Sequence, residues 1–152
     1  MSDELVALAT RLIAFDTASA DGVLEAAGFV EGWLEARGIE VSTEEVRGLP
    51  VLKAEVGPES APTVVLHGHL DVVPGQVGQF EPRLDGDRLY GRGAYDMKGA
   101  LAAMLLTTAA MREQERVRVR LGIVGDEESE EEVDRGSDRL VDGGFVGDFA
   151  IT

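Results

Sequence analysis

The stretch Thr63-Val-Val-Leu-His67 is followed directly by Gly68-His69-Leu70-Asp71. Its first part is β-branched and nearly all apolar, which is typical of a strand that is covered on both faces of a sheet. The residues that follow are polar and of the types that bind metals or move protons. We therefore expect a buried strand that ends beside a functional site.

A second strand-like run, Val117 to Val124, has the same relation to a polar segment, because Asp126-Glu-Glu128 follows it. Sites in open α/β sheets form just beyond the carboxyl ends of the strands. If the two runs are neighbouring parallel strands, the three acidic residues meet His69 and Asp71 at one edge of the sheet.

Helices and strands alternate along the rest of the chain, which predicts an α/β fold with a mixed, largely parallel sheet flanked by helices. Apolar residues at helical spacing mark the helices, and Gly38 has the position expected just after the second of them. The predicted helices are 3–15, 21–37, 97–112 and 137–141; the other strands are 39–46, 51–56 and one that begins at Phe149; 74–95 is a loop.

Composition excludes several classes of protein. The 152 residues contain 14 Lys and Arg, 29 Asp and Glu and no cysteine, for a net charge of −15. Cysteine-based metal sites, disulfides and thiol nucleophiles are therefore excluded, and the charge disfavours nucleic acid as a partner. No run approaches the roughly 18 apolar residues of a membrane span, and the N-terminus lacks the basic region of a signal peptide. We expect a soluble, cytoplasmic protein without a membrane partner.

A histidine and several carboxylates, without cysteine, suit a hydrolytic zinc site or a site for a similar divalent ion. His69 offers a neutral imidazole, and Asp71, two residues on, can accept a hydrogen bond from its other nitrogen and fix its tautomer. Asp96 lies at the start of the helix that connects the two strands and can place one oxygen on each of two metals. Of Glu127 and Glu128, one can bind metal while the other handles protons.

Taken singly, these features have ordinary structural explanations. A lone His-x-Asp is weak evidence, and the acidic run from Asp126 to Asp134 is also typical of a solvated helix N-terminus. The run Gly91-Arg-Gly93 resembles a dinucleotide fingerprint, but it follows a loop and Asp96 stands where the third glycine belongs. The remaining structural assignments are a strand-end residue (His67), core residues (Met97 and Met104) and surface charge (Glu130, Glu131 and Glu132).

Three longer segments together resemble the ordered signatures of one family of zinc hydrolases. The segments are Leu66-His-Gly-His-Leu-Asp-Val-Val-Pro74, Leu89-Tyr-Gly-Arg-Gly-Ala-Tyr-Asp-Met-Lys-Gly99 and Gly125-Asp-Glu-Glu128. The family includes aminoacylases, acetylornithine deacetylase, succinyl-diaminopimelate desuccinylase and carboxypeptidase G. The resemblance covers essentially the whole chain.

This resemblance implies two divalent ions, with zinc expected and cobalt or manganese as alternatives. It also implies a cis peptide bond between Asp96 and Met97. Carried over by position, it gives each site residue a role: His69 binds one metal, Asp71 orients His69, Asp96 bridges the two metals, Glu127 is the general base and Glu128 binds the second metal.

The chain also departs from the family pattern. Members are typically more than twice as long and carry a lid or dimerisation domain and a C-terminal catalytic part, so we expect residues 1–152 to be the N-terminal part of the catalytic domain. Each metal then lacks one protein ligand, and the chain alone is expected to be nearly inactive and to self-associate through its incomplete sheet. The sequence does not decide whether the chain is a fragment, a disrupted gene product or half of a split enzyme.

The sequence thus predicts the N-terminal portion of a di-zinc amidohydrolase or exopeptidase that acts on small N-acyl amino acids or peptides. The alternative is a non-catalytic acidic module that keeps the scaffold and uses it for association. The substrate, the native metal and the oligomeric state are not determined by these residues.

Overall fold

The computed structural model of the chain describes residues 2–129 and 133–152. The assignment of Glu130, Glu131 and Glu132 to surface charge lies outside these residues. The described part contains a five-stranded sheet in the order β1-β2-β6-β3-β7. Its strands are β1 (Val41–Val46), β2 (Leu49–Val56), β3 (Thr63–His69), β6 (Arg118–Val124) and β7 (Phe149–Ile151).

The register of β3 against β6 positions the candidate site. These strands pair in parallel from Thr63 opposite Arg118 to His69 opposite Val124, and the next residue, Leu70, donates its N–H to the carbonyl of Val124 at 2.9 Å. β7 is also parallel to β3, whereas β2 is antiparallel to both of its neighbours. The expected parallel neighbours are confirmed, and both strands end at the same edge of the sheet.

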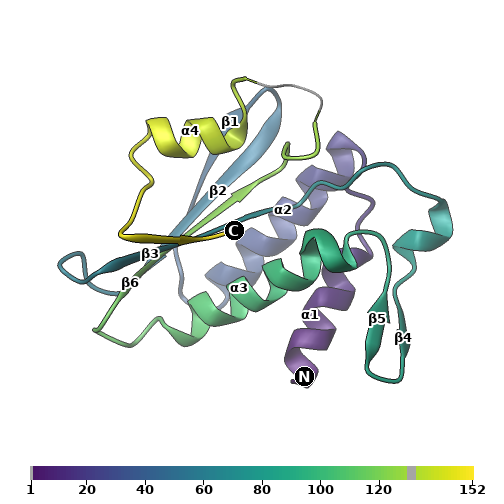
Figure 1. Cartoon of the computed structure of the whole chain (residues 1–152), viewed down its shortest axis with the longest axis horizontal. Coiled ribbons are helices and arrows are strands. Elements are labelled where there is room, and N and C mark those ends of the chain that lie inside the picture. Colours follow the sequence, from purple (N-terminus) through teal and green to yellow (C-terminus); the bar gives the residue numbers. More distant parts are fainter. Residues whose placement is uncertain (1, 130–132) are drawn as a thin grey trace.

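Helices cover both faces of the sheet (Figure 1). Apolar residues of the first three helices pack with Leu52, Leu66 and Leu121 in the main core, and Leu140 and Phe145 pack with Val51, Val65 and Val124 on the other face. The helices are α1 (Asp3–Ile13), α2 (Ala20–Glu35), α3 (Gly99–Ala110) and α4 (Gly136–Asp142). The predicted fold class, a mixed and largely parallel sheet flanked by helices, is confirmed.

Local sequence signals explain where α2 begins and ends. The Ser19 side chain accepts a hydrogen bond from the Gly22 N–H and caps the first turn. At the other end, Ile39 and Gly38 donate their N–H groups to the carbonyls of Leu34 and Glu35. Gly38 has a φ of 71°, so the helix ends in a Schellman motif with glycine in the expected left-handed position.

The loop predicted between residues 74 and 95 contains regular structure that the sequence analysis missed. A short 3-10 turn spans Val77–Phe80, and a hairpin joins β4 (Arg83–Asp85) to β5 (Arg88–Tyr90). The two residues of its turn include Gly86, whose φ is 62°. The Gly86-Asp87 turn was the available signal, because a two-residue hairpin turn needs a positive φ angle and glycine adopts one at its first position.

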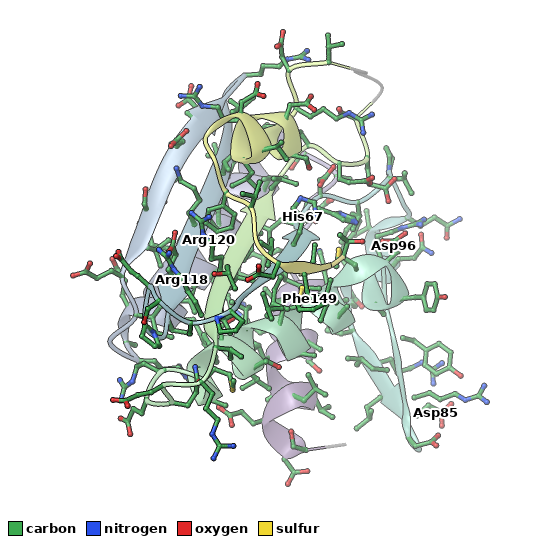
Figure 2. All side chains as sticks on the ribbon, turned by 60° about the vertical axis from the view of Figure 1, so that its left-hand side comes forward. His67, Asp85, Asp96, Arg118, Arg120 and Phe149 are labelled. Atoms are coloured by element: carbon green, nitrogen blue, oxygen red, sulfur yellow. The ribbon has the colours of Figure 1, made fainter. Side chains whose placement is uncertain are left out.

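The strand that begins at Phe149 forms one edge of the sheet (Figure 2). Phe149 and Ile151 are exposed, and Asp148 accepts the Thr63 N–H at 2.7 Å where β7 starts beside β3. Within residues 2–129 and 133–152, none of the helices combines the length and the apolar character needed to cross a bilayer.

Candidate metal centre

His69 is the last residue of β3 and is almost completely buried. Its Nδ1 lies 3.0 Å from the backbone oxygen of Asp71 and 3.4 Å from Asp71 Oδ1, while Nε2 lies 3.1 Å from Asp96 Oδ1. Burial by itself lowers the pKa of His69, but Asp71 and Asp96 outweigh it and raise the pKa to about 9. The surroundings of His69 therefore favour positive charge.

Asp71 connects the loops that follow the two central strands. Its Oδ2 accepts the backbone N–H of Glu128 at 2.7 Å, and its carboxylate is buried. Burial raises the pKa of Asp71, but hydrogen bonds from His69 and from the Glu128 N–H outweigh it, so the pKa lies below its ordinary value. The carboxylate therefore stays ionised and holds both His69 and the Glu128 backbone in place.

Asp96 lies in the irregular turn Ala94–Lys98 that leads into α3. The peptide bond between Asp96 and Met97 is cis, as the sequence resemblance implied. Met97 packs against the main core, and its sulfur accepts the His69 N–H at 3.4 Å. The Asp96 carboxylate remains largely exposed beside the buried imidazole.

Lys98 anchors this turn to the protein interior, a role that its sequence position alone did not predict. Its side chain is fully buried, and its Nζ donates to the carbonyl of Phe15, at the end of the first helical segment, at 2.9 Å. Burial lowers the pKa of Lys98 to about 8. The available signal was its place two residues after Asp96 in the second signature.

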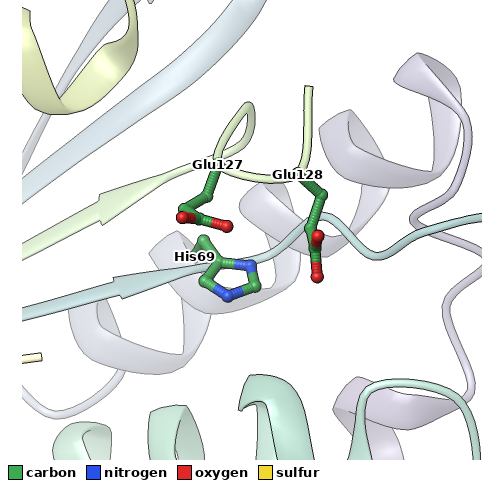
Figure 3. A group of neighbouring side chains, drawn as sticks. All are labelled: His69, Glu127 and Glu128. Carbon is green, nitrogen blue, oxygen red and sulfur yellow. The ribbon is translucent and has the colours of Figure 1, made fainter. Parts of the chain in front are cut away.

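Glu127 and Glu128 lie on the loop after β6 and approach His69 (Figure 3). Among the described residues, these three form the one group of His and carboxylate side chains whose ligand atoms all lie within 4.8 Å of one another. Asp96 joins the group through its contact with His69 Nε2. Burial raises the pKa of Glu128, and the nearby carboxylates of Glu127, Asp96 and Asp71 act in the same direction against the effect of His69.

These residues fit a divalent metal ion. Imidazole nitrogen and carboxylate oxygen are ligands of zinc, and two ligands in its tetrahedral shell lie about 3.3 Å apart. The 3.1 Å between His69 Nε2 and Asp96 Oδ1 is close to that separation. Besides burial, repulsion from neighbouring carboxylates raises the pKa of Glu128, and a divalent ion would relieve that repulsion.

Asp126 differs from the solvated acid that the sequence also allowed. It is buried, and its two oxygens accept the backbone N–H of Gly136 at 3.0 and 2.8 Å. Burial raises the pKa of Asp126, although the Gly136 N–H partly offsets it. The hydrogen bond between Gly136 and Asp126 connects the start of α4 to the end of β6, close to Glu127.

We predict that Gly136→Ala lowers the free energy of unfolding by about 1–3 kcal/mol. A Cβ at this position would lie 2.9 Å from Asp126 Oδ1 and from the Val124 side chain, so the start of α4 must shift. Urea unfolding followed by circular dichroism measures the change. The control is Gly78→Ala, where a Cβ meets no atom within 4 Å, and equal stability of the two variants would contradict the prediction.

His67 lies outside the group of His69, Glu127 and Glu128 whose ligand atoms converge, and it contacts α4. Its Nε2 lies 3.0 Å from Ser137 Oγ, and burial together with nearby His69 lowers its pKa. His67 and Ser137 line a cavity of about 860 Å³ together with His69, Asp96 and Glu127 of the candidate centre. A contact with a residue 70 positions away has no signal in the local sequence.

Comparisons with known proteins identify relatives of the chain. Residues 65–151 match the family described as Peptidase family M20/M25/M40. The chain is 40% identical over 132 residues to the succinyl-diaminopimelate desuccinylase of Gluconobacter oxydans, which covers 81% of this chain and 34% of that protein. It is 47% identical over 76 residues to the enzyme of the same name from Erythrobacter litoralis, covering 47% of this chain and 20% of that protein.

Solved structures resemble the chain over nearly all of its length. An M20 family metallo-carboxypeptidase from Sulfolobus solfataricus superposes with a TM-score of 0.83 at 27% identity, covering 99% of this chain and 37% of that one. Human carnosine dipeptidase 1 superposes with a TM-score of 0.79 at 25% identity, covering 97% of this chain and 37% of that one. The chain thus spans about a third of the length of these proteins. The family match over residues 65–151 includes most of β3, all of β6 and all five candidate site residues. The chain belongs to Peptidase family M20/M25/M40.

Proposed function

We propose that this chain forms part of the metal centre of an amidohydrolase or peptidase that cleaves small N-acyl amino acids or peptides. The observation that carries the proposal is the convergence of His69, Glu127 and Glu128 within 4.8 Å, with Asp96 against His69, where two parallel strands end. The names of similar proteins support an amide-bond substrate, because they include a desuccinylase, a dipeptidase and a carboxypeptidase.

The side chains divide the work as follows. His69 and Asp96 would hold one divalent ion, with zinc as the first candidate, and Asp96 and Glu128 would hold the other. Such an ion, when bound, polarises the substrate carbonyl and makes water more acidic. Asp71 keeps the Nδ1 proton of His69 in place, so that Nε2 faces Asp96.

Glu127 is the proposed general base. Its side chain is exposed at the centre and lies within the group formed with His69 and Glu128, so a water molecule can reach it. Glu127 takes a proton from the attacking water and then delivers it to the leaving amine nitrogen, which makes the amine a better leaving group.

Zinc titration of two histidine variants tests the metal assignment. We expect His69→Ala to weaken zinc binding by about tenfold to a hundredfold, since it removes a nitrogen ligand from a site with few ligands. His67→Ala serves as the matched control, because His67 lies on the same strand but faces Ser137, and it should change the affinity by less than threefold.

Isothermal titration calorimetry measures both affinities, with circular dichroism as a check of folding. Equal losses in the two variants, or no zinc binding by the unaltered chain, would contradict the proposed centre. The second result would favour the non-catalytic association module.

A further inference from the structure

Arg92 lies between the hairpin and the candidate metal centre, in a motif that the metal site does not use. Its backbone N–H donates to the Gln79 carbonyl at 2.7 Å, and its Nη2 donates to Gln79 Oε1 at 3.1 Å. Gln79 Oε1 also accepts the Gln76 N–H at 2.9 Å. The 3-10 turn therefore holds both the backbone and the guanidinium of Arg92.

Gly75 makes room for this guanidinium. A Cβ at residue 75 would lie 2.7 Å from Arg92 Nε and 2.7 Å from Gln79 Oε1. The guanidinium thus packs directly over the glycine backbone, and any side chain there would displace it. The Gln79 side-chain amide and the absence of a Cβ at Gly75 together fix the position of the Arg92 guanidinium.

The same guanidinium faces a cavity that it shares with two proposed metal ligands. Arg92, Asp96 and Glu128 line a cavity of about 320 Å³ together with backbone of the turn before α3. Within the part of the chain that the structure describes, Arg92 forms no ion pair. Its buried Nε, moreover, has no hydrogen-bond acceptor there.

We propose that Arg92 binds a carboxylate of the substrate beside the metal centre; this inference rests on the proposed function. A guanidinium stays charged at all accessible pH values, and carboxylate is the acceptor that matches its paired N–H groups. The Nη end of the guanidinium offers such a pair, because each of its two nitrogens carries two N–H groups and Gln79 takes only one of them. The side chain is already held in place, so little conformational freedom is lost on binding.

Asp96 and Glu128 make this binding dependent on metal. Without an ion, the two carboxylates place more negative than positive charge in the cavity and oppose an incoming anion. An ion held by them removes that opposition and leaves the charge of Arg92 available. We therefore expect the substrate carboxylate to bind more tightly to the zinc-loaded chain than to the metal-free chain.

The test follows the Arg92 Nε–H resonance by NMR, assigned by its loss in Arg92→Lys. The probes are N-acetylglycine, with its carboxylate on the amine side, N-succinylglycinamide, with its carboxylate on the acyl side, and neutral N-acetylglycinamide. One or both acids should shift the resonance of the zinc-loaded chain, and which of them binds more tightly identifies the source of the carboxylate. The neutral amide should not shift it.

Three variants separate a bound carboxylate from a structural role. Arg92→Gln should weaken binding of the preferred acid by about tenfold to a hundredfold, and Gly75→Ala should weaken it by displacing the guanidinium without removing it. Arg88→Gln, in the exposed part of the hairpin, should leave the affinity unchanged. Zinc binding should be preserved in all three.

The outcomes distinguish this inference from the proposed function. If zinc binds but neither acid shifts the resonance, the carboxylate site is wrong and the metal centre stands. If zinc does not bind but an acid still shifts the resonance of the metal-free chain at higher concentration, the carboxylate site stands and the proposed function is contradicted. Equal shifts with the acids and the neutral amide would show that the response does not depend on a carboxylate, which overturns the inference.

Discussion

Replacement of Glu127 by glutamine is expected to lower the turnover number for amide hydrolysis by about a hundredfold to ten-thousandfold at saturating zinc. The amide has almost the shape of the carboxylate but cannot accept the proton of the attacking water. Because the side chain is exposed at the centre, the loss should come from proton transfer and not from folding.

The measurement is hydrolysis of N-succinyl and N-acetyl amino acids by the full-length gene product at several zinc concentrations, with zinc affinity determined in parallel. Glu59→Gln is the control, since Glu59 is an exposed acid in the turn between β2 and β3, at the other end of the sheet. A Glu127→Gln variant that keeps more than a third of the unaltered rate at saturating zinc would show that another group is the base.

Gly22→Ala is expected to lower the free energy of unfolding by at least about 3 kcal/mol. A Cβ at residue 22 would lie 1.8 Å from the carbonyl oxygen of Asp16, a contact that backbone atoms cannot relieve without moving the loop before α2. That loop carries the Ser19 cap and the buried Thr17, whose carbonyl accepts the Val72 N–H beside the metal centre.

Gly28→Ala in the same helix should instead raise the free energy of unfolding. Gly28 is exposed, and a Cβ there meets no atom within 4 Å, so alanine adds about 0.5–1 kcal/mol through its higher helix propensity. Urea unfolding monitored by circular dichroism measures both changes. Similar effects of the two substitutions would mean that helix propensity, and not the contact with Asp16, governs residue 22.

Local patterns predicted the secondary structure well because each element carries its own signal. Helix α2 has a serine cap and a glycine after its last turn, and both act within a few residues of the helix ends. The first part of β3 is an apolar, β-branched run that indicates a covered strand, and β6 ends in the buried apolar residues Leu121 to Val124. The hairpin of β4 and β5 was missed because three-residue strands are too short for a periodic pattern.

The sequence by itself determined the types of the site residues and their order along the chain. His69 and Glu127 follow apolar runs, and the side chains beyond the carboxyl ends of parallel neighbours meet at one edge of a sheet. The signature motifs added the family, since their spacing reflects the loops that carry these residues.

Only the tertiary structure decided which partners hold each side chain. Asp126 is buried against Gly136, His67 contacts Ser137, and Lys98 reaches Phe15, 83 residues earlier in the chain. Such contacts depend on how helices and loops pack across the sheet, and residues far apart in sequence carry no local sign of one another. For the same reason, the contact of the Arg92 guanidinium with Gly75 is visible only in the tertiary structure.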